Sequence, residues 1–260
     1  MKLCPVFFFL YNLRMETNQR NKSKLSVNLF IFAVGVLLGM LLFGAATWGD
    51  IEASVFHSTI IGDETLKGLE CPMVISREEV GEVKVTLKNP TDKQLERTVR
   101  VHVSEGFVTV FREITSRVTI EPGGEQQLSW PVTGDDAVWN YFVMVRAYLF
   151  SNYPLPSESG SCGVLVVDLF NLPGSLIVVF TLLASLLCMG TGLWLWVNEH
   201  KPLLGRALNA AYAMGGVAAV VLGGILSSLA GMWSLSALFF VLVVLLIIGI
   251  GSYFTQTYGE

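Results

Sequence analysis

The residues of this chain best suited to catalysis or metal binding are its few histidines. They are His57, His102 and His200, and no cysteine or carboxylate stands beside them at the spacing of a metal site. His102 lies at an outward position of an alternating segment, so we expect a solvated surface side chain. A copper or zinc site formed by His57 and His102 across the fold is the alternative. We expect no metal site.

Two acidic pairs are the other candidates for chemistry. Glu78–Glu79 and Asp135–Asp136 occupy predicted turns, and paired carboxylates do acid–base work only in a cleft. We expect both pairs to be solvated. The chain contains no phosphate-binding loop, nucleophile elbow, HExxH motif or dinucleotide fingerprint. The sequence therefore predicts a protein that is not an enzyme and has no cofactor.

Two of the four cysteines, Cys71 and Cys162, lie near the two ends of the region between the first and second apolar segments. In an oxidising compartment this placement predicts a disulfide. Two free buried thiols are the alternative. Cys4 and Cys188 fall outside that region, and we do not expect them to join the bond.

The elements that must position these residues include long apolar segments. Of 260 residues, 52% are hydrophobic and only 15% are charged, against about a quarter in soluble domains. Residues 25–49, 169–198 and 207–259 contain no charge. Because a spanning helix needs about 20 apolar residues, the third stretch must hold two spans, divided near Gly231. We expect transmembrane helices over residues 25–47, 171–197, 207–230 and 234–254.

Basic residues near the span ends predict the orientation. They precede the first span or lie between the second and third: Arg14, Arg20, Lys22, Lys24, Lys201 and Arg206. The positive-inside rule then places residues 1–24, 198–206 and 255–260 in the cytoplasm. Residues 48–170 are extracytoplasmic and carry 10 basic and 18 acidic residues, which disfavours nucleic acid as a partner. We expect a multi-pass protein of the plasma membrane, with a bacterial origin.

The first apolar segment has a second interpretation, as a cleaved signal peptide. It has a basic lead and small residues at Gly44-Ala45-Ala46. However, its apolar run is long for a signal peptide, and Gly35 and Gly39 have helix-packing spacing. We favour a retained anchor. Met15 is an alternative start to Met1, and a short interfacial segment before Met15 is the other interpretation.

From about Ile51 to Asp168 the hydrophobic pattern is typical of strands. The segments EVKVTLK, TVRVHVS, RVTIE and QLSWPV alternate, and NYFVMVRAYLF is apolar enough for a sandwich interior. Turn signals stand at residues 89–92, 122–124 and 134–136. We expect seven or eight short strands in an antiparallel sandwich without helix. The predicted fold class is a four-span α-helical membrane protein with an all-β, extracytoplasmic Ig-like sandwich.

The order VKVTLKNPTD, VRVHVSEG, VTIEPGGEQQLSWPV resembles the bacterial immunoglobulin-like adhesion and carbohydrate-associated modules of the CARDB type. In those modules a strand ending in Asn-Pro/Thr is followed by a second strand and a Pro-Gly-Gly turn. The resemblance implies a fold and no specific activity. The topology is similar to that of claudin-like tetraspan proteins, without their tryptophan and paired-cysteine loop signature.

The third predicted span is rich in small residues, with the sequence AAYAMGGVAAVVLGGILSSLAG over residues 210–231. Small residues recur every four positions and let another helix approach closely. With the Gly35/Gly39 spacing, the predicted helix-packing residues are Gly35, Gly39, Ala211, Gly215, Ala219, Gly223, Ser227 and Gly231. Their partners are either this chain's own spans or another membrane protein, including a second copy. We expect Gly223→Leu to disrupt assembly more than replacement of Val221, which we expect to face lipid.

These observations favour a non-enzymatic membrane protein that displays its Ig-like domain to bind a protein or glycan, assembles a membrane complex, or does both. The loop LFSNYPLPSESGS offers Tyr153, Pro154 and Pro156 as contacts for a partner. An accessory or pore-forming subunit of a transport system is the alternative, although the spans hold no ionisable residue at mid-depth. An extracytoplasmic enzyme is the lesser alternative.

Overall fold

The computed structural model describes residues 5–57, 61–169 and 172–256, with side chains from Val27 onward except at Arg206 and residues 251–256. Cys4 lies outside the described residues, as do the side chains of the basic residues before the first span. The four helices are α1 (Pro5–Val55), α2 (Gly174–Glu199), α3 (Arg206–Leu229) and α4 (Trp233–Gln256).

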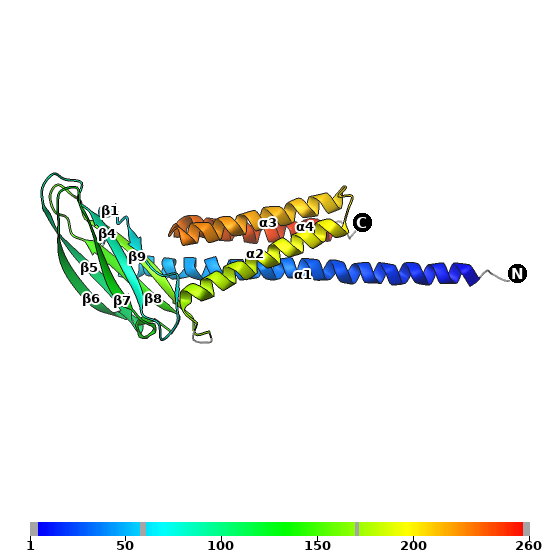
Figure 1. Cartoon of the computed structure of the whole chain (residues 1–260), viewed down its shortest axis with the longest axis horizontal. Coiled ribbons are helices and arrows are strands. Elements are labelled where there is room, and N and C mark those ends of the chain that lie inside the picture. Colours follow the sequence, from blue (N-terminus) through cyan, green and yellow to red (C-terminus); the bar gives the residue numbers. More distant parts are fainter. Residues whose placement is uncertain (1–4, 58–60, 170–171, 257–260) are drawn as a thin grey trace. The chain divides into compact units, whose positions relative to one another are not determined.

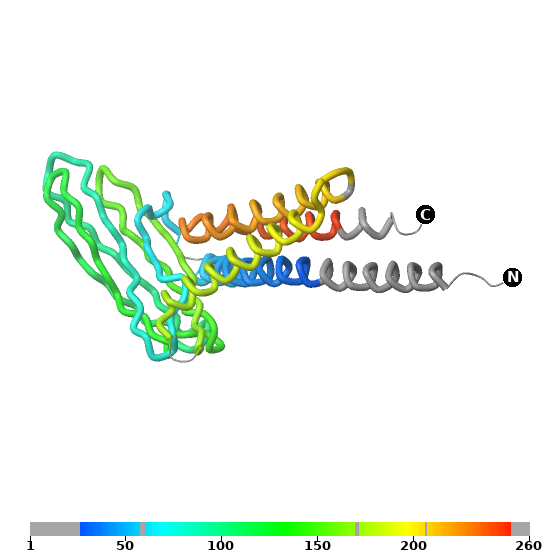
Figure 2. Tube along the Cα trace, turned by 45° about the vertical axis from the view of Figure 1, so that its right-hand side comes forward, coloured from blue at the N-terminus to red at the C-terminus, as the bar shows by residue number. Residues whose placement is uncertain are grey.

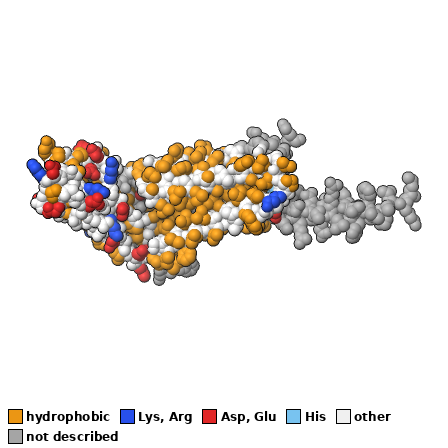
Figure 3. All heavy atoms as spheres, turned by 45° about the horizontal axis from the view of Figure 1, so that its top comes forward, with side chains coloured by type: hydrophobic (Ala, Val, Ile, Leu, Met, Phe, Trp, Pro, Cys, Tyr) orange, Lys and Arg blue, Asp and Glu red, His pale blue; other side chains and the backbone are white. Residues whose placement is uncertain are grey.

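All four helices contain a segment long and apolar enough to cross a membrane, as the sequence predicted. These segments are Val27–Val55, Gly174–Glu199, Ala207–Leu229 and Trp233–Ile250. Hydrophobic side chains cover the visible faces of the helices, whereas acidic and basic side chains gather over the strands (Figure 3). Helix α1 continues to Val55, eight residues past the expected end of the first span at residue 47.

The chain divides into two compact units, and each helix contributes to both. The first unit takes α1 up to Gly39 with residues 182–222 and the chain from Val241 onward. Within it, Ser185 Oγ donates a hydrogen bond to the Gly35 carbonyl at 2.7 Å. A β-carbon at Gly35 would lie only 2.6 Å from the Met189 backbone nitrogen. Gly35 therefore allows the backbones of α1 and α2 to approach each other closely.

The second unit comprises residues 40–181 and 223–240 and contains two β-sheets. Sheet A has the order β1 (Glu64–Thr65), β9 (Glu158–Val166), β8 (Phe142–Leu149), β5 (Leu95–Glu105) and β6 (Phe107–Ile120), with β3 (Val74–Ile75) also paired to β9. Sheet B has the order β2 (Leu69–Glu70), β4 (Gly81–Lys88) and β7 (Glu125–Val132). Figure 1 labels most of these strands. All pairs are antiparallel except β1–β9 and β3–β9, which are parallel.

Alternation of apolar and polar residues explains why the two sheets pack face to face. In β4 the buried positions are Gly81, Val83, Val85 and Leu87, with exposed or half-buried residues between them. Strands from both sheets contribute to one core, whose fully buried members include Val83, Val85, Val99, Val101, Val103, Val132, Val143, Val145, Ala147 and Val164. Apolar burial of this kind contributes about 25 cal/mol per Å² removed from water. Two packed sheets are therefore present in this unit, as predicted, although β1 and β3 pair with β9 in parallel and not antiparallel.

The predicted turns hold the strand ends through side-chain hydrogen bonds. Asn89, which follows β4, is 2% exposed. Its Nδ2 donates to the carbonyls of Lys93, Ile120 and Glu121, and its Oδ1 accepts from the Thr91 backbone. Gly123 has a φ of +66°, in the region that favours glycine. The NPTD and PGG motifs thus close one end of the sandwich.

The last turns of α1 lie against the outer face of sheet A (Figure 2). Ala53 and Phe56 of α1 pack with Val138 and Met144 in a second, smaller hydrophobic cluster. Arg146 of β8 donates from Nη1 to the carbonyls of Ser54 at 3.1 Å and Phe56 at 3.2 Å. Cationic donors at a helix C-terminus satisfy its last carbonyls. This contact explains why the helix extends past residue 47, the expected end of the first span.

A disulfide joins Cys71 to Cys162, which confirms the predicted pairing. Both sulfur-bearing side chains pack against the sandwich core. Cys188 in α2 is free. The bond therefore ties the segment after β2 to the middle of β9.

Candidate functional site

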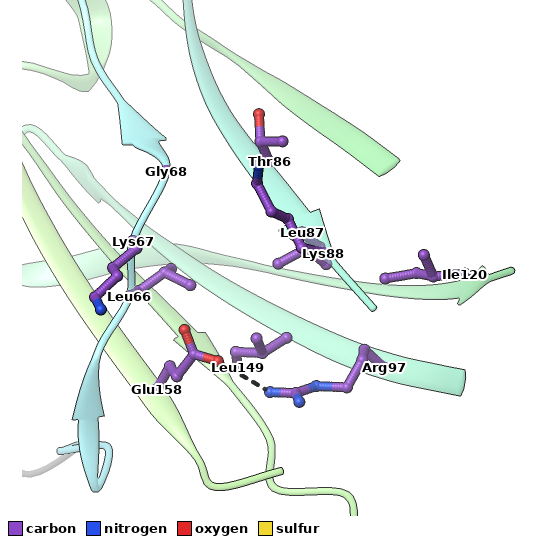
Figure 4. A pocket seen from close by; sticks show the side chains of 10 residues that line it. All are labelled: Leu66, Lys67, Gly68, Thr86, Leu87, Lys88, Arg97, Ile120, Leu149 and Glu158. Atoms are coloured by element: carbon purple, nitrogen blue, oxygen red, sulfur yellow. Dashed lines mark ion pairs between the residues drawn. The ribbon is translucent and has the colours of Figure 1, made fainter. Parts of the chain in front are cut away.

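One pocket lies at the end of the sandwich where β4 and β8 finish and β5 and β9 begin (Figure 4). We call it the sandwich-end pocket, and its volume is about 300 Å³. Its lining combines the apolar end of the core with a few charged groups. The lining residues are Leu66, Lys67, Gly68, Thr86, Leu87, Lys88, Arg97, Ile120, Leu149 and Glu158.

Arg97 is the most deeply buried charge in this pocket. It shares the inward face of β5 with Leu95 and Val99, and its side chain is only 2% exposed. Its Nη2 donates to the Pro156 carbonyl at 3.2 Å and lies 3.6 Å from Glu158 Oε1. Its Nε is buried and has no hydrogen-bond partner among the described residues. Because a buried charge is costly unless fully paired, this guanidinium is only partly compensated.

Burial acts on both members of this ion pair. It raises the pKa of Glu158, and the positive charges of Arg97 and Lys67 oppose that shift. It also lowers the pKa of Arg97, while Glu158 raises it. Each partner thus stabilises the charge of the other, but desolvation dominates for both. A separation of 3.6 Å is too long for a strong charge-assisted hydrogen bond.

Two lysines add positive charge to the pocket wall. Lys67 and Lys88 are exposed, and Lys88 Nζ pairs with Glu125 Oε1 at 2.6 Å. Glu158 is the acidic residue among those that line the pocket. The lining therefore carries three cationic side chains and one acidic side chain, in a domain that is acidic as a whole. Such a site suits an anionic group.

The predicted partner loop borders this pocket. It joins β8 to β9, and the carbonyl of Pro156 receives the hydrogen bond from Arg97. Tyr153 is 94% exposed, and Asn152 Nδ2 holds the loop by donating to the Glu96 carbonyl at 2.6 Å. Tyr153 and Pro154 thus belong to a connection that is tied down at the edge of a charged pocket.

His102 is not solvated, and that expectation is wrong. It is 3% exposed because the rings of His57 and Phe111 lie against it on the outer face of sheet A. Its ring lies 5.1 Å from the His57 ring and 4.5 Å from the Phe111 ring, between centroids. Burial lowers the pKa of His102, and the hydrogen bond from its Nε2 to Glu113 at 3.2 Å opposes that shift. Although His57 and His102 do meet, the described residues form no group of three metal-binding side chains.

The acidic pairs also have roles that the sequence did not reveal. Asp136 is 6% exposed, and its Oδ2 accepts a hydrogen bond from the Thr133 amide at 2.8 Å. Glu79 Oε2 accepts from the Ser76 amide at 2.9 Å and from the Gly174 amide, the first of α2, at 2.7 Å. A carboxylate at a helix N-terminus is stabilising. The expectation that both pairs are simply solvated is therefore wrong for Asp136 and Glu79.

The predicted helix-packing residues of α3 divide into two groups. A β-carbon at Gly223 would lie 2.9 Å from the Phe239 ring of α4. At Gly215 and Gly231, by contrast, it would meet no described atom within 4 Å. Ala211 is half-buried, Ala219 is exposed, and Ser227 Oγ bonds to the Gly223 carbonyl of its own helix. Gly39 on α1 is buried.

Val221 does not face lipid, and that expectation is wrong. It is 0% exposed and belongs to a buried row that also includes Ala210, Met214, Val217 and Ile225. The buried positions of α3 thus include small residues, Gly224, Ser227 and Ser228, as well as bulkier ones. The open positions at Gly215 and Ala219 lie off that row.

We expect Gly223→Leu to destabilise the α3–α4 hairpin by about 2 kcal/mol, because the added side chain overlaps the Phe239 ring. Because Val221 is buried, the control is Leu226→Ala, at a position of the same helix that is 66% exposed. Heat-induced aggregation of the detergent-solubilised full chain measures the effect. A midpoint unchanged by Gly223→Leu, or lowered equally by Leu226→Ala, would contradict the expectation.

No protein-family model and no curated protein matches this chain. Similar solved structures include a cycloisomaltooligosaccharide glucanotransferase from Paenibacillus sp., 12% identical over 42% of this chain and 15% of that one, with a TM-score of 0.32. A CARDB domain from Pyrococcus furiosus, in complex with di-metal ions, is 17% identical over 42% of this chain and 97% of that domain, with a TM-score of 0.31. A superoxide reductase from Ignicoccus hospitalis is 14% identical over 38% of this chain and 78% of that one, with a TM-score of 0.28.

These neighbours thus include a domain of the CARDB type, the type that the sequence resembles. This chain spans 15% of the length of the glucanotransferase. Likeness at these scores carries no argument about ligand or activity.

Proposed function

We propose that this protein is an integral membrane protein that holds its sandwich on the extracytoplasmic side as a non-enzymatic binding module for an acidic glycan. Four apolar helices support membrane insertion. The Cys71–Cys162 disulfide supports an oxidising compartment for the sandwich. The basic residues near the span ends support cytoplasmic termini.

The partly compensated guanidinium of Arg97 is the observation that carries the binding proposal. It lines a pocket of about 300 Å³ that Lys67 and Glu158 also line. A carboxylate on a ligand would supply the counter-charge that one carboxylate at 3.6 Å does not. The exposed Tyr153 ring, on the loop that borders the pocket, offers an apolar face to a sugar ring.

Full-length protein in lipid nanodiscs, incubated with an array of acidic and neutral oligosaccharides, tests this proposal. We expect binding to uronic-acid oligosaccharides and a loss of about tenfold in affinity for Lys67→Glu, because a cation becomes an anion at the pocket wall. Lys84→Glu is the matched control, because this substitution makes the same change of charge at a residue of β4 that does not line the pocket.

Two results would count against the proposal. One is equal binding of neutral and acidic oligosaccharides, and the other is equal weakening by Lys67→Glu and Lys84→Glu. Selective binding to acidic peptides on a parallel array would instead identify a protein partner.

A further inference from the structure

A second and larger pocket lies beside β9 and the end of α1, and the function proposed above does not use it. We call it the helix-end pocket, and its volume is about 710 Å³. Its walls all belong to one compact unit and come from the end of α1, the segment from Thr65 to Met73, strand β9 and the turn between α3 and α4. The Cys71–Cys162 disulfide forms part of its wall.

The charged groups of this pocket are acidic. Asp50 and Glu70 line it, and no lysine, arginine or histidine occurs among its described lining residues. Asp50 Oδ1 accepts a hydrogen bond from the Gly163 amide at 3.0 Å, which fixes the carboxylate at the pocket wall. The pocket therefore has the opposite charge to the sandwich-end pocket and suits a cation.

Hydroxyl groups line the same pocket. Ser54, Ser159 and Ser161 line the pocket from α1 and β9. Ser228 of α3 lines it as well and is only 8% exposed, yet its Oγ has no hydrogen-bond partner among the described residues. A buried hydroxyl without a partner is costly. A ligand that donates hydrogen bonds would satisfy it once the Ser228 side chain rotates toward the pocket.

The remaining wall places this polar site at the level where apolar helices end. Ala46 belongs to the apolar segment of α1, and Leu229 and Trp233 are the last and first residues of two apolar helices. Tryptophan is enriched at membrane–water interfaces. The combination of acidic and hydroxyl groups with an apolar wall at this depth matches a lipid headgroup with its upper acyl chain.

We propose that the helix-end pocket binds the primary ammonium group of an amine-bearing lipid headgroup. The ammonium donates hydrogen bonds to the carboxylate of Asp50 and to the Ser228 hydroxyl, with Trp233 beside the acyl chain. This inference rests on the membrane placement proposed above but not on the sandwich-end pocket.

Native mass spectrometry of the detergent-solubilised full chain, titrated with phosphatidylethanolamine, tests the inference. We expect retention of phosphatidylethanolamine to exceed that of phosphatidylglycerol, which has no ammonium group, by roughly tenfold. Asp50→Asn should remove this preference while keeping an oxygen to accept from the Gly163 amide. Ser228→Ala should reduce retention by roughly threefold.

Glu105→Gln is the matched control, because Glu105 is an exposed acid at the end of β5 and does not line the pocket. Equal retention of both lipids, or full retention by Asp50→Asn, would overturn the inference. Competition by soluble phosphoethanolamine distinguishes a free headgroup from a whole lipid as the ligand. If phosphoethanolamine displaces the bound lipid, the pocket recognises the headgroup alone. If the lipid stays bound, the pocket recognises the intact lipid. Protease digestion of sealed proteoliposomes separately tests membrane placement.

Discussion

Replacing Cys71 and Cys162 together by serine should lower the free energy of unfolding of the sandwich by about 4 kcal/mol. The two residues are 91 positions apart in sequence. In the chain-entropy model, a bond that closes a loop of this length removes more freedom from the unfolded chain than a short one does. The loss is a large part of the roughly 5–15 kcal/mol that stabilises a typical domain. Pulse proteolysis of the full chain across a urea series measures it.

Cys188→Ser is the control for this experiment, because Cys188 is the free cysteine of α2. Its urea midpoint should equal that of the unsubstituted protein. If the double serine variant also keeps that midpoint, the disulfide does not stabilise the sandwich, and the prediction is wrong.

Gly163→Val should detach the end of α1 from sheet A and destabilise the second unit by about 3 kcal/mol. A β-carbon at Gly163 would overlap the backbone of Gly49, so neither side can adjust by rotating a side chain. The substitution also removes the close approach that lets the Gly163 amide donate to Asp50. Hydrogen–deuterium exchange of the α1 end and of β9 in nanodiscs measures the separation, as faster exchange in both segments.

Gly190→Ala supplies the comparison, since a β-carbon there would meet no described atom within 4 Å. Its exchange profile should match the unsubstituted protein. Unchanged protection of residues 49–55 in Gly163→Val would show that the contact is not needed.

Much of the sandwich could be predicted because its central strands alternate strictly. The segments EVKVTLK and QLSWPV coincide with β4 and β7, and the NPTD and PGG turns lie where expected. Strand β6 is longer than predicted, running from Phe107 to Ile120. Most residues of β6 are exposed or half-buried, so the alternation of apolar residues indicated only the C-terminal end of this strand.

Strand β9 was missed because its composition is typical of a loop. The segment ESGSCGVLV is rich in serine and glycine, yet it pairs with β8 along its length. Glycine in a strand marks a place where another chain segment comes close. Gly160 faces Leu66 and Leu69, and Gly163 faces the backbone of Gly49. The position of glycines in a strand could therefore have predicted the contact between Gly163 and Gly49, whereas the apolar periodicity could not.

The sandwich-end pocket could be predicted only in part. Arg97 occupies an inward position in the alternation of β5, between Leu95 and Val99, and a charge at such a position is a sequence signal that was overlooked. Glu158 and Lys67 join it from strands and loops far away in sequence. Their meeting depends on strand order, which alternation does not determine. His102 was misjudged for a related reason, since sequence alternation cannot show that a helix covers the outer face.

The capping of α1 by Arg146 has a mechanical consequence. Residues 40–55 of α1 belong to the same compact unit as the sandwich, and Arg146 of β8 donates to the carbonyls of Ser54 and Phe56 at the end of the helix. Gly163 and Asp50 fix the same helix one turn earlier. These contacts therefore restrict rotation of the sandwich relative to this part of α1. If a bound ligand turns sheet A, residues 40–55 of α1 should turn with it.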